Sequence, residues 1–305
     1  HPMNWAVKDG LFGAASESVA LTNLGFTDIH PLEPGQIAVV EKGGYRIEQF
    51  APSKKQTRCF FEWVYFSNVA SEIDDLSVYQ SRARAGKRLA EFENQPIDNN
   101  CIVVPVPDTA KAAADAFAYH IGVPCMEGVI RNRYVGRTFI QPRVMRGKNA
   151  KSKYTSLPSV LGGKRIFLVE DSVVRSLTLQ TLAHLLREIG DAAEVHVRVA
   201  CPPIVGPCFY GIDMSTLDEL FAPTYFSARY TGTPTPQILQ KMARTLKIDS
   251  LHYLPVPELA PSIGCETDTL CKGCVTSKYP TTWGNKLIRQ ARKNVKEGTT
   301  GRTYG

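Results

Sequence analysis

The sequence predicts an α/β fold in which a parallel sheet is flanked by helices and preceded by a smaller β-rich unit. The chain has 305 residues, of which 43% are hydrophobic and 21% charged, as in globular proteins with a substantial core. From residue 101 onward, continuous apolar runs alternate with amphipathic segments of helical period, which is typical of a parallel sheet covered on both faces. The first fifty residues instead carry short β-like runs separated by turns. The length favours two domains, with one large α/β domain as the alternative.

The elements before residue 101 are predicted from turns and periodicity. The Gly43-Gly44 pair between two apolar runs predicts a hairpin over residues 37–50. Residues 60–68 read as a half-buried strand, because their aromatic residues alternate with polar ones. Residues 77–93 have the 3.6-residue spacing of a helix that begins at Ser77, a favoured N-cap residue.

The central part repeats a strand, a turn and a helix. The expected order is strand 101–107, helix 108–122, strand 124–130, strand 164–171, helix 175–190 and strand 194–202. After Asp213 the chain reads as helices and loops, with a frayed tail after Gly298. Ligands of parallel sheets bind at the carboxyl ends of the strands, so the residues that follow Pro107 and Val169 are the first candidates for a site.

Charge and targeting features exclude some classes of protein. The net charge of +7 suits either nucleic acid or a polyphosphate substrate, but the basic runs 143–153 and 286–296 read as a solvated loop and helix face, and no nucleic acid is expected. No apolar run reaches the roughly 18 residues of a membrane span. The first residues lack a secretion signal, so we expect a cytoplasmic protein that binds no membrane. Position 1 is His, as in a processed or cloned fragment.

The eight cysteines are expected to be reduced, since disulfides are rare in the cytosol. Cys101, Cys125 and Cys201 lie in apolar runs and read as packing residues. Cys271 and Cys274 have the two-residue spacing that lets both thiolates ligate one metal centre. An iron–sulfur cluster, a four-cysteine zinc site and unligated thiols all remain open.

The strongest motif for chemistry spans residues 166–178. An apolar strand ends in two adjacent carboxylates, Glu170 and Asp171, and a turn rich in Ser and Thr then opens a helix. The free N–H groups of a helix N-terminus favour phosphate. Paired carboxylates suit the vicinal hydroxyls of a ribose, directly or through Mg²⁺. The alternative is a capped helix with a solvated acidic turn.

The sequence resembles the type I phosphoribosyltransferases and, among them, the family of glutamine phosphoribosylpyrophosphate amidotransferases. The resemblance is carried in order by residues 15–21, 34–40, 61–66, 71–91, 104–109, 128–142, 168–178 and 202–214. RNRYVGRTFIQ and PCFYGID are specific to that family. It implies a type I phosphoribosyltransferase fold over residues 59–285, with the end of a glutaminase-like β unit in residues 1–58 and a basic tail in residues 286–305.

The activity implied is the attack of ammonia on phosphoribosyl pyrophosphate, with Mg²⁺, giving 5-phosphoribosylamine and pyrophosphate in the first step of purine synthesis. The resemblance also implies a homo-oligomer inhibited by purine nucleotides. It assigns ribose and 5′-phosphate to Glu170, Asp171, Ser172, Val173, Val174, Arg175, Ser176, Leu177 and Thr178, and Mg²⁺ to the two carboxylates. It assigns pyrophosphate to Asp108, Thr109, Ala110 and Lys111. A lid over residues 131–153 would bring Arg131, Arg133, Tyr134 and Arg137 to the substrate as catalytic contacts.

The same resemblance matches Cys59 and Cys208, together with Cys271 and Cys274, to the ligands of a [4Fe-4S] cluster. The glutaminase nucleophile lies upstream of the residues matched, so we expect this chain to use free ammonia, ammonia from a separate glutaminase, or ammonia from a missing N-terminal portion.

The sequence departs from the family at Glu170, where Asp is usual, at Ser176 and Leu177, where Gly and Thr are usual, and at Ala110 and Lys111. Loss of the Gly removes room for a close approach of backbone to phosphate. These changes keep an alternative open: a non-catalytic nucleotide-sensing or assembly subunit of the same fold.

Overall fold

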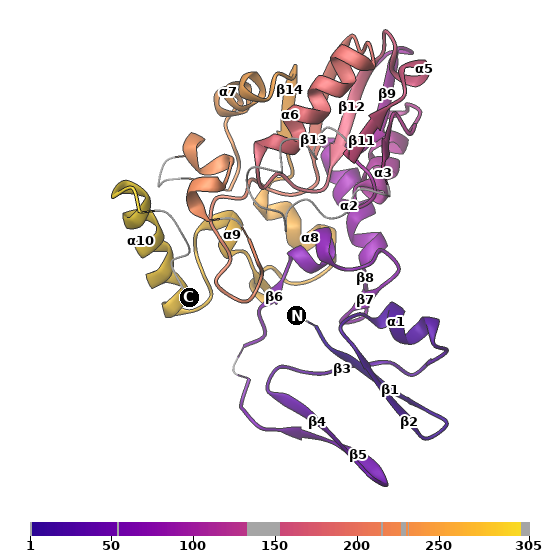
Figure 1. The fold of residues 1–305 in the computed structure, drawn as a ribbon, viewed down its shortest axis with the longest axis vertical. Helices are drawn as coiled ribbons and strands as arrows, with labels where there is room; N and C mark the ends of the chain where they lie inside the picture. The colour runs from indigo at the N-terminus through magenta and orange to yellow at the C-terminus, as the bar shows by residue number, and fades with distance from the viewer. Residues whose placement is uncertain are drawn as a thin grey trace.

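The computed structural model describes residues 2–53, 55–132, 153–214, 216–226, 230 and 232–299. Figure 1 shows a lower part made of the N-terminal strands and an upper part in which helices surround a central sheet. The long axis of the molecule runs through both parts.

The central sheet has four parallel strands in the order β14-β13-β12-β9. They are β9 (Cys101–Pro105), β12 (Arg165–Glu170), β13 (Glu194–Val199) and β14 (Ser250–Tyr253). Almost every residue of β9, β12 and β13 is buried, as expected of strands covered on both faces. The prediction of a parallel sheet flanked by helices is confirmed.

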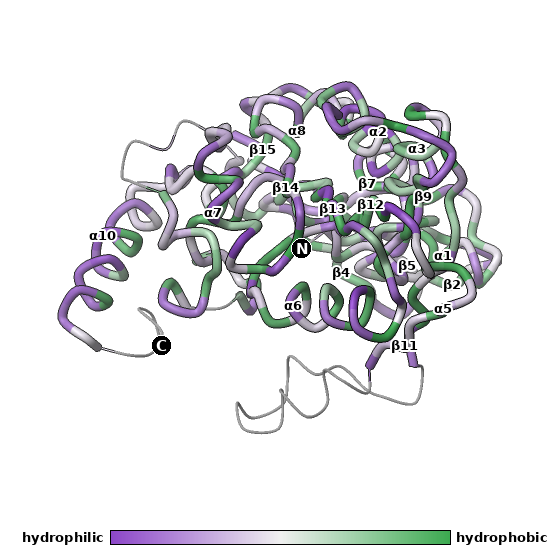
Figure 2. The backbone as a smooth tube through the Cα atoms, turned by 90° about the horizontal axis from the view of Figure 1, so that it is seen from above, coloured by the Kyte–Doolittle hydropathy of each residue, from purple (hydrophilic) through white to green (hydrophobic). Residues whose placement is uncertain are grey.

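Helices cover both faces of this sheet, as Figure 2 shows from above. On one side lie α2 (Val78–Glu91), α3 (Lys111–Ile121) and α8 (Leu259–Ile263), and on the other lies α6 (Ser176–His184). Helix α7 (Pro236–Leu246) packs on α6 and β14. The rings of Phe117 from α3 and Phe167 from β12 are fully buried, with centroids 5.9 Å apart, and join helix to sheet. Ser77 caps α2 as predicted, since its hydroxyl accepts from the Gln80 N–H at 3.3 Å.

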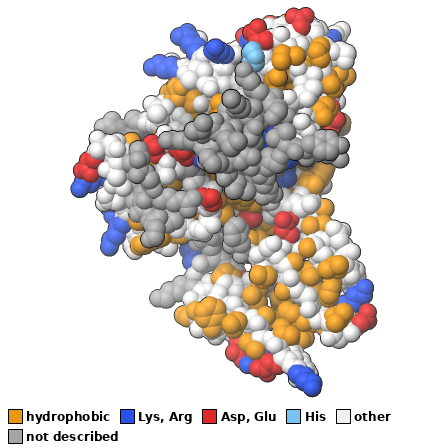
Figure 3. Space-filling view, viewed as in Figure 1, with side chains coloured by type: hydrophobic (Ala, Val, Ile, Leu, Met, Phe, Trp, Pro, Cys, Tyr) orange, Lys and Arg blue, Asp and Glu red, His pale blue; other side chains and the backbone are white. Residues whose placement is uncertain are grey.

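The N-terminal unit is built from antiparallel strands. It contains β1 (Asn4–Lys8), β2 (Leu11–Ala15), α1 (Ser18–Asn23), β3 (His30–Pro31), β4 (Gln36–Glu41) and β5 (Gly44–Gln49). Strands β4 and β5 form the predicted hairpin, and Gly43 has the positive φ of 104° that its turn needs. Hydrophobic side chains gather on the surface of this unit (Figure 3), among them Leu11, Val40, Tyr45 and Phe50.

Short elements complete the described chain. They are β6 (Arg58–Cys59), η1 (Glu62–Phe66), β7 (Glu72–Ile73), β8 (Leu76–Ser77), β10 (Val129–Arg131), β11 (Tyr154–Ser156), α5 (Pro158–Leu161), η3 (Leu185–Ile189), η4 (Leu217–Glu219), η5 (Ala222–Tyr225), η6 (Val256–Glu258), η7 (Thr267–Thr269), β15 (Leu270–Cys271), α9 (Gly273–Thr276) and α10 (Thr282–Lys296). None of the helices in the described ranges is long and apolar enough to cross a membrane.

The structure corrects the predicted strand over residues 60–68. Within this segment Glu62–Phe66 form the π-helical turn η1, which the Ser67 N–H closes by donating to the Glu62 carbonyl at 3.1 Å. Phe60, Phe61 and Trp63 are all buried rather than alternating between core and solvent. A short apolar run is compatible with either a strand or a buried helical turn, so periodicity alone could not separate the two.

A second correction concerns β14, because the sequence after Asp213 was predicted to hold only helices and loops. Residues Ser250–Tyr253 pair in parallel with β13 as an edge strand of the main sheet, and His196 lies opposite Ser250. The strand has only four residues and includes two polar ones, so it lacks the continuous apolar run of its neighbours. The helix predicted over residues 175–190 is also shorter, because α6 passes into the π-helical turn η3 at Leu185.

Candidate active site

The parallel register brings two predicted site segments to the same edge of the sheet. Val169 of β12 lies opposite Pro105 of β9, so the segments that follow these strands leave the sheet side by side. The Val106 N–H donates to the Val169 carbonyl at 2.9 Å and extends this pairing past the end of β9. The predicted pyrophosphate loop, residues 107–111, therefore starts next to the predicted ribose-binding residues.

Glu170 and Asp171 are buried carboxylates at this edge, with 7% and 8% of their surface exposed. The Asp171 N–H donates to Glu170 Oε1 at 3.0 Å, and the Ser172 hydroxyl donates to Asp171 Oδ1 at 2.6 Å. Burial and the neighbouring Asp171 charge raise the pKa of Glu170 well above its usual range, and burial raises the pKa of Asp171 to about 6. Two poorly solvated carboxylates this close together favour a bound cation or hydroxyl donors.

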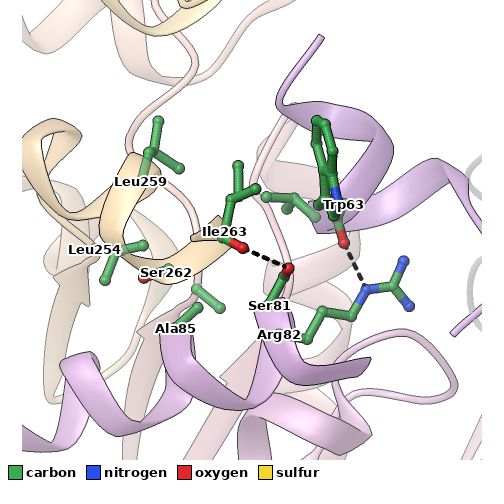
Figure 4. A pocket seen from close by; sticks show the side chains of 10 residues that line it. Trp63, Ser81, Arg82, Ala85, Leu254, Leu259, Ser262 and Ile263 are labelled. Atoms are coloured by element: carbon green, nitrogen blue, oxygen red, sulfur yellow. Dashed lines mark hydrogen bonds between the residues drawn. The ribbon is translucent and has the colours of Figure 1, made fainter. Parts of the chain in front are cut away.

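Two cationic side chains, Arg82 and Lys153, lie within electrostatic reach of this pair. Arg82 of α2 is only 6% exposed, and burial lowers its pKa while the Asp171 charge opposes that shift. Its Nε donates to the Trp63 carbonyl at 2.8 Å (Figure 4), and its Nη2 donates to the Ser67 carbonyl at the same distance. Burial lowers the pKa of Lys153, which also lies within electrostatic reach of both carboxylates. Nothing in the sequence marks Arg82 as a residue near the site, because a basic residue in a helix gives no sign that it is buried.

A small cavity of about 20 Å³ lies beside Arg82, between η1, α2 and α8. Figure 4 shows Ser81, Leu254, Ser262 and Ile263 around it, with Ser81 donating to the Ile263 carbonyl at 3.3 Å. That volume admits a water molecule and is far too small for a phosphorylated sugar. This cavity is therefore not the substrate site, and the candidate site is the edge of the sheet where Glu170 and Asp171 are buried.

The predicted phosphate segment turns from β12 into α6, whose first residue is Ser176. Val173 is buried and Val174 packs against the core, so of these two residues only the backbone is available to a ligand. Arg175 Nη2 donates to Glu219 Oε2 at 2.7 Å, so its guanidinium is already paired. Leu177 and Thr178 are exposed.

The predicted pyrophosphate loop holds Asp108 and Thr109 in a turn, and α3 begins at Lys111 after the buried Ala110. The Pro107–Asp108 peptide bond is cis. Two ion pairs connect this loop with the segment that enters β10: Lys111 with Glu127, and Arg131 Nη1 with Asp108 Oδ2 at 3.3 Å.

Of the predicted lid contacts, the structure describes Arg131, which pairs with Tyr154 across the β10–β11 ladder. Arg133, Tyr134 and Arg137 lie outside the described residues. Near the two ends of the segment predicted to form the lid, the Asn132 N–H donates to the Lys153 carbonyl at 2.8 Å.

The four cysteines predicted to bind a cluster lie in one region. Strands β6 and β15 pair in parallel and put Cys271 opposite Cys59. Burial raises the pKa of Cys274 well above its usual range, and Cys59, Cys271 and Cys208 lie close enough to raise it further. Burial raises the pKa of Cys59 to about 12. Within the described ranges, no three His, Cys, Asp or Glu side chains are arranged to hold a metal ion.

The sheet order, the acidic pair at the end of β12 and the turn into α6 define a type I phosphoribosyltransferase fold. No protein-family profile matches the chain. It is 38% identical over 281 residues to the amidophosphoribosyltransferase of Methanothermobacter thermautotrophicus, covering 92% of this chain and 56% of the relative. It is 35% identical over 285 residues to the Bacillus subtilis amidophosphoribosyltransferase, again covering 92% of this chain and 56% of the relative.

A solved structure gives the same result. The B. subtilis glutamine phosphoribosylpyrophosphate amidotransferase complexed with ADP and GMP superposes with a TM-score of 0.77 at 35% identity, over 92% of this chain and 59% of that chain. The chain is a homologue of the amidophosphoribosyltransferases, and it spans about half the length of the curated relatives it matches.

Proposed function

We propose that this chain carries the phosphoribosyl-transfer half of an amidophosphoribosyltransferase, a glycosyltransferase of purine biosynthesis. Ammonia attacks phosphoribosyl pyrophosphate and gives 5-phosphoribosylamine and pyrophosphate. The observation that carries the proposal is the buried Glu170–Asp171 pair, which ends β12 beside the loop that follows β9, in a chain homologous to proteins of that name. The relatives' shared name disfavours the non-catalytic sensing alternative.

Residues of the candidate site are suited to bind each part of the substrate. The ribose hydroxyls bind Glu170 and Asp171, whose buried oxygens gain hydrogen bonds that water does not supply there. The 5′-phosphate binds the turn that opens α6, through backbone N–H groups and the hydroxyls of Ser172 and Ser176. The pyrophosphate binds the loop of Asp108–Lys111, where Lys111 supplies a positive charge.

The reaction needs no protein nucleophile. The nitrogen lone pair of ammonia forms the new bond to the anomeric carbon, the bond from that carbon to the pyrophosphate oxygen breaks, and pyrophosphate leaves with the electron pair. The nitrogen then loses a proton. Negative charge grows on the leaving group, so Lys111 and Arg131 stabilise the transition state more than the bound substrate.

Glu170 and Asp171 are the residues that would hold Mg²⁺ together with substrate oxygens, because paired carboxylates are ligands that this ion prefers. A bound Mg²⁺ ion would neutralise charge on the departing pyrophosphate. The lid residues Arg133, Tyr134 and Arg137 belong to the same proposal, in which closure excludes water from the reacting carbon.

For the cysteines we propose a [4Fe-4S] cluster held by Cys59, Cys208, Cys271 and Cys274. The resemblance matches these four positions to cluster ligands, and Cys59, Cys208 and Cys271 all lie within electrostatic reach of Cys274, which supports one shared centre. The cluster would fasten the segment around α9 to β6.

Three further features are proposed on the resemblance alone: a homo-oligomer, inhibition by purine nucleotides, and an ammonia supply from solution or from a glutaminase. The solved B. subtilis relative is described in complex with ADP and GMP.

Pyrophosphate release tests the proposed function. The chain is incubated with phosphoribosyl pyrophosphate and Mg²⁺, with ammonium, with glutamine or with neither. We expect release that requires ammonium and Mg²⁺. Substrate binding without release under any condition would contradict the enzymatic proposal and support the sensing alternative.

A further inference from the structure

Two surface ion pairs lie at the predicted pyrophosphate loop, one formed by Lys111 of the loop and one by Arg131 of β10. Lys111 Nζ contacts Glu127 Oε1, and the two side chains are 47% and 54% exposed. Arg131 contacts Asp108 in the same way, with side chains 33% and 67% exposed. The four charges sum to zero, so the loop presents little net positive charge to an incoming anion.

The backbone at both ends of the Lys111–Glu127 pair is anchored. Lys111 is the first residue of α3 and follows Ala110, which is completely buried. On the other side, the Met126 N–H donates to the Val103 carbonyl at 2.8 Å, just before Glu127. Gly128, just after Glu127, lies so close to the Leu161 side chain that an added Cβ would collide with it. Glu127 is therefore held within reach of Lys111 by the core, while its carboxylate stays in solvent.

The Lys111–Glu127 ion pair changes the pKa of Lys111, but it is exposed enough for another anion to replace Glu127. The hydrogen bond that Lys111 donates to Glu127 is the main reason that the pKa of Lys111 is raised, and the charges of Asp108 and Asp115 add to it. Exposed ion pairs contribute little to stability, because water and salt compete with them. A pyrophosphate group carries more negative charge than one carboxylate, so it can replace Glu127 on the Lys111 ammonium.

We propose that Glu127 is an internal competitor for Lys111 that lowers the affinity of the loop for the pyrophosphate group of the substrate. The inference rests on the proposed function, which puts pyrophosphate at residues 108–111. It adds a residue that tunes substrate affinity without belonging to the substrate-binding set. Asp108 holds Arg131 similarly, but it lies within the predicted substrate loop, so Glu127 is the group that can be removed with the loop intact.

The proposal predicts a change in binding without a change in chemistry. In Glu127→Gln the competing charge is lost, so the KM for phosphoribosyl pyrophosphate and the Kd for Mg²⁺-pyrophosphate should both fall about two- to fivefold. The kcat should stay the same, because the Lys111–Glu127 pair is already broken in the bound complex, so its cost is common to the bound substrate and the transition state. The difference should shrink at about 0.5 M salt, where exposed charges are screened.

A double-mutant cycle tests whether the effect acts through Lys111. Lys111→Gln should weaken pyrophosphate binding, and adding Glu127→Gln to it should give no gain. The matched control is Glu91→Gln, which removes an exposed carboxylate that pairs with Arg88 at 2.8 Å on α2, and which should leave KM and Kd unchanged.

Calorimetric titration of the whole chain with Mg²⁺-pyrophosphate distinguishes a failure of the proposed function from a failure of the role proposed for Glu127. No binding to the wild-type chain would contradict the proposed function itself. Wild-type binding that Glu127→Gln leaves unchanged or weakens, or a gain from Glu127→Gln that persists in the Lys111→Gln background, would overturn the competitor role alone.

Discussion

At the scale of single residues, the burial of the charged Arg82 side chain is a feature that the sequence does not predict. Arg82 lies in the segment 77–93, for which the sequence predicts only a helix, yet its guanidinium is buried and bonded to the backbone carbonyls of Trp63 and Ser67. Helical period shows which face a residue occupies, but it does not show that a long cationic side chain turns inward to bond backbone.

Arg82→Met should therefore lower the free energy of unfolding by about 2 to 4 kcal/mol, because it leaves the carbonyls of Trp63 and Ser67 without these donors. Urea unfolding monitored by circular dichroism measures the change. The matched control, Arg88→Met, removes an exposed arginine from the same helix and should cost less than about 1 kcal/mol. Equal losses in the two variants would mean that the Arg82 hydrogen bonds contribute no more than a surface side chain.

His252 gives a second residue-scale prediction. Burial is the main cause that lowers its pKa to about 4. The charges of Arg198 and His196 act in the same direction, and the charge of Glu93 opposes them. The unfolded value is about 6.5, so the folded state prefers neutral His252. Its contribution to stability is complete above about pH 6.5 and is lost as the pH falls towards 4.

Gln does not titrate, so in His252→Gln the free energy of unfolding should fall less between pH 7 and pH 5 than in the wild type. The difference should be about 1 to 2 kcal/mol, a modest size because the His252 side chain is only partly buried. Urea unfolding at the two pH values gives the comparison. An identical pH dependence in both proteins would show that His252 titrates normally in the folded chain.

At the scale of elements, the sequence predicts those whose pattern is long and regular. The cap of α2 by Ser77, the β4–β5 hairpin and the alternation of β9, α3, β12, α6 and β13 are all present. The errors lie in short segments. Residues 60–68 bury consecutive aromatic side chains in a π-helical turn, and β14 has four residues whose pairing with β13 depends on tertiary structure.

The pairing of β6 with β15 supports a prediction about the cysteines. Cys271→Ser removes one thiolate of the proposed four, so the protein should lose the broad brown absorbance of the cluster and most of its iron. The measurements are visible absorbance and iron and sulfide content after anaerobic purification. Cys125→Ser changes a cysteine outside the proposed set and should keep both signals. A colourless wild-type protein that contains zinc would contradict the cluster.

At the scale of the whole molecule, the candidate site is created by parallel pairing. The sequence could predict that Glu170 and Asp171 follow a strand, and the general rule for parallel sheets points to that edge. It could not predict which cations lie near this pair, because Arg82 and Lys153 come within electrostatic reach of it through packing between distant segments. The roles given to the predicted site residues therefore stay predictions that variants must test.

The most direct test of the central claim is pyrophosphate release, with ammonium and Mg²⁺, by Asp171→Asn and by Asp191→Asn. Both variants replace one carboxylate with an amide, but Asp191 is exposed and lies before β13, at the other end of the sheet. We expect Asp171→Asn to lose at least about a hundredfold in kcat/KM, equivalent to roughly 2.7 kcal/mol, while Asp191→Asn keeps wild-type activity. Full activity in Asp171→Asn would contradict the claim that the buried pair binds the reacting sugar.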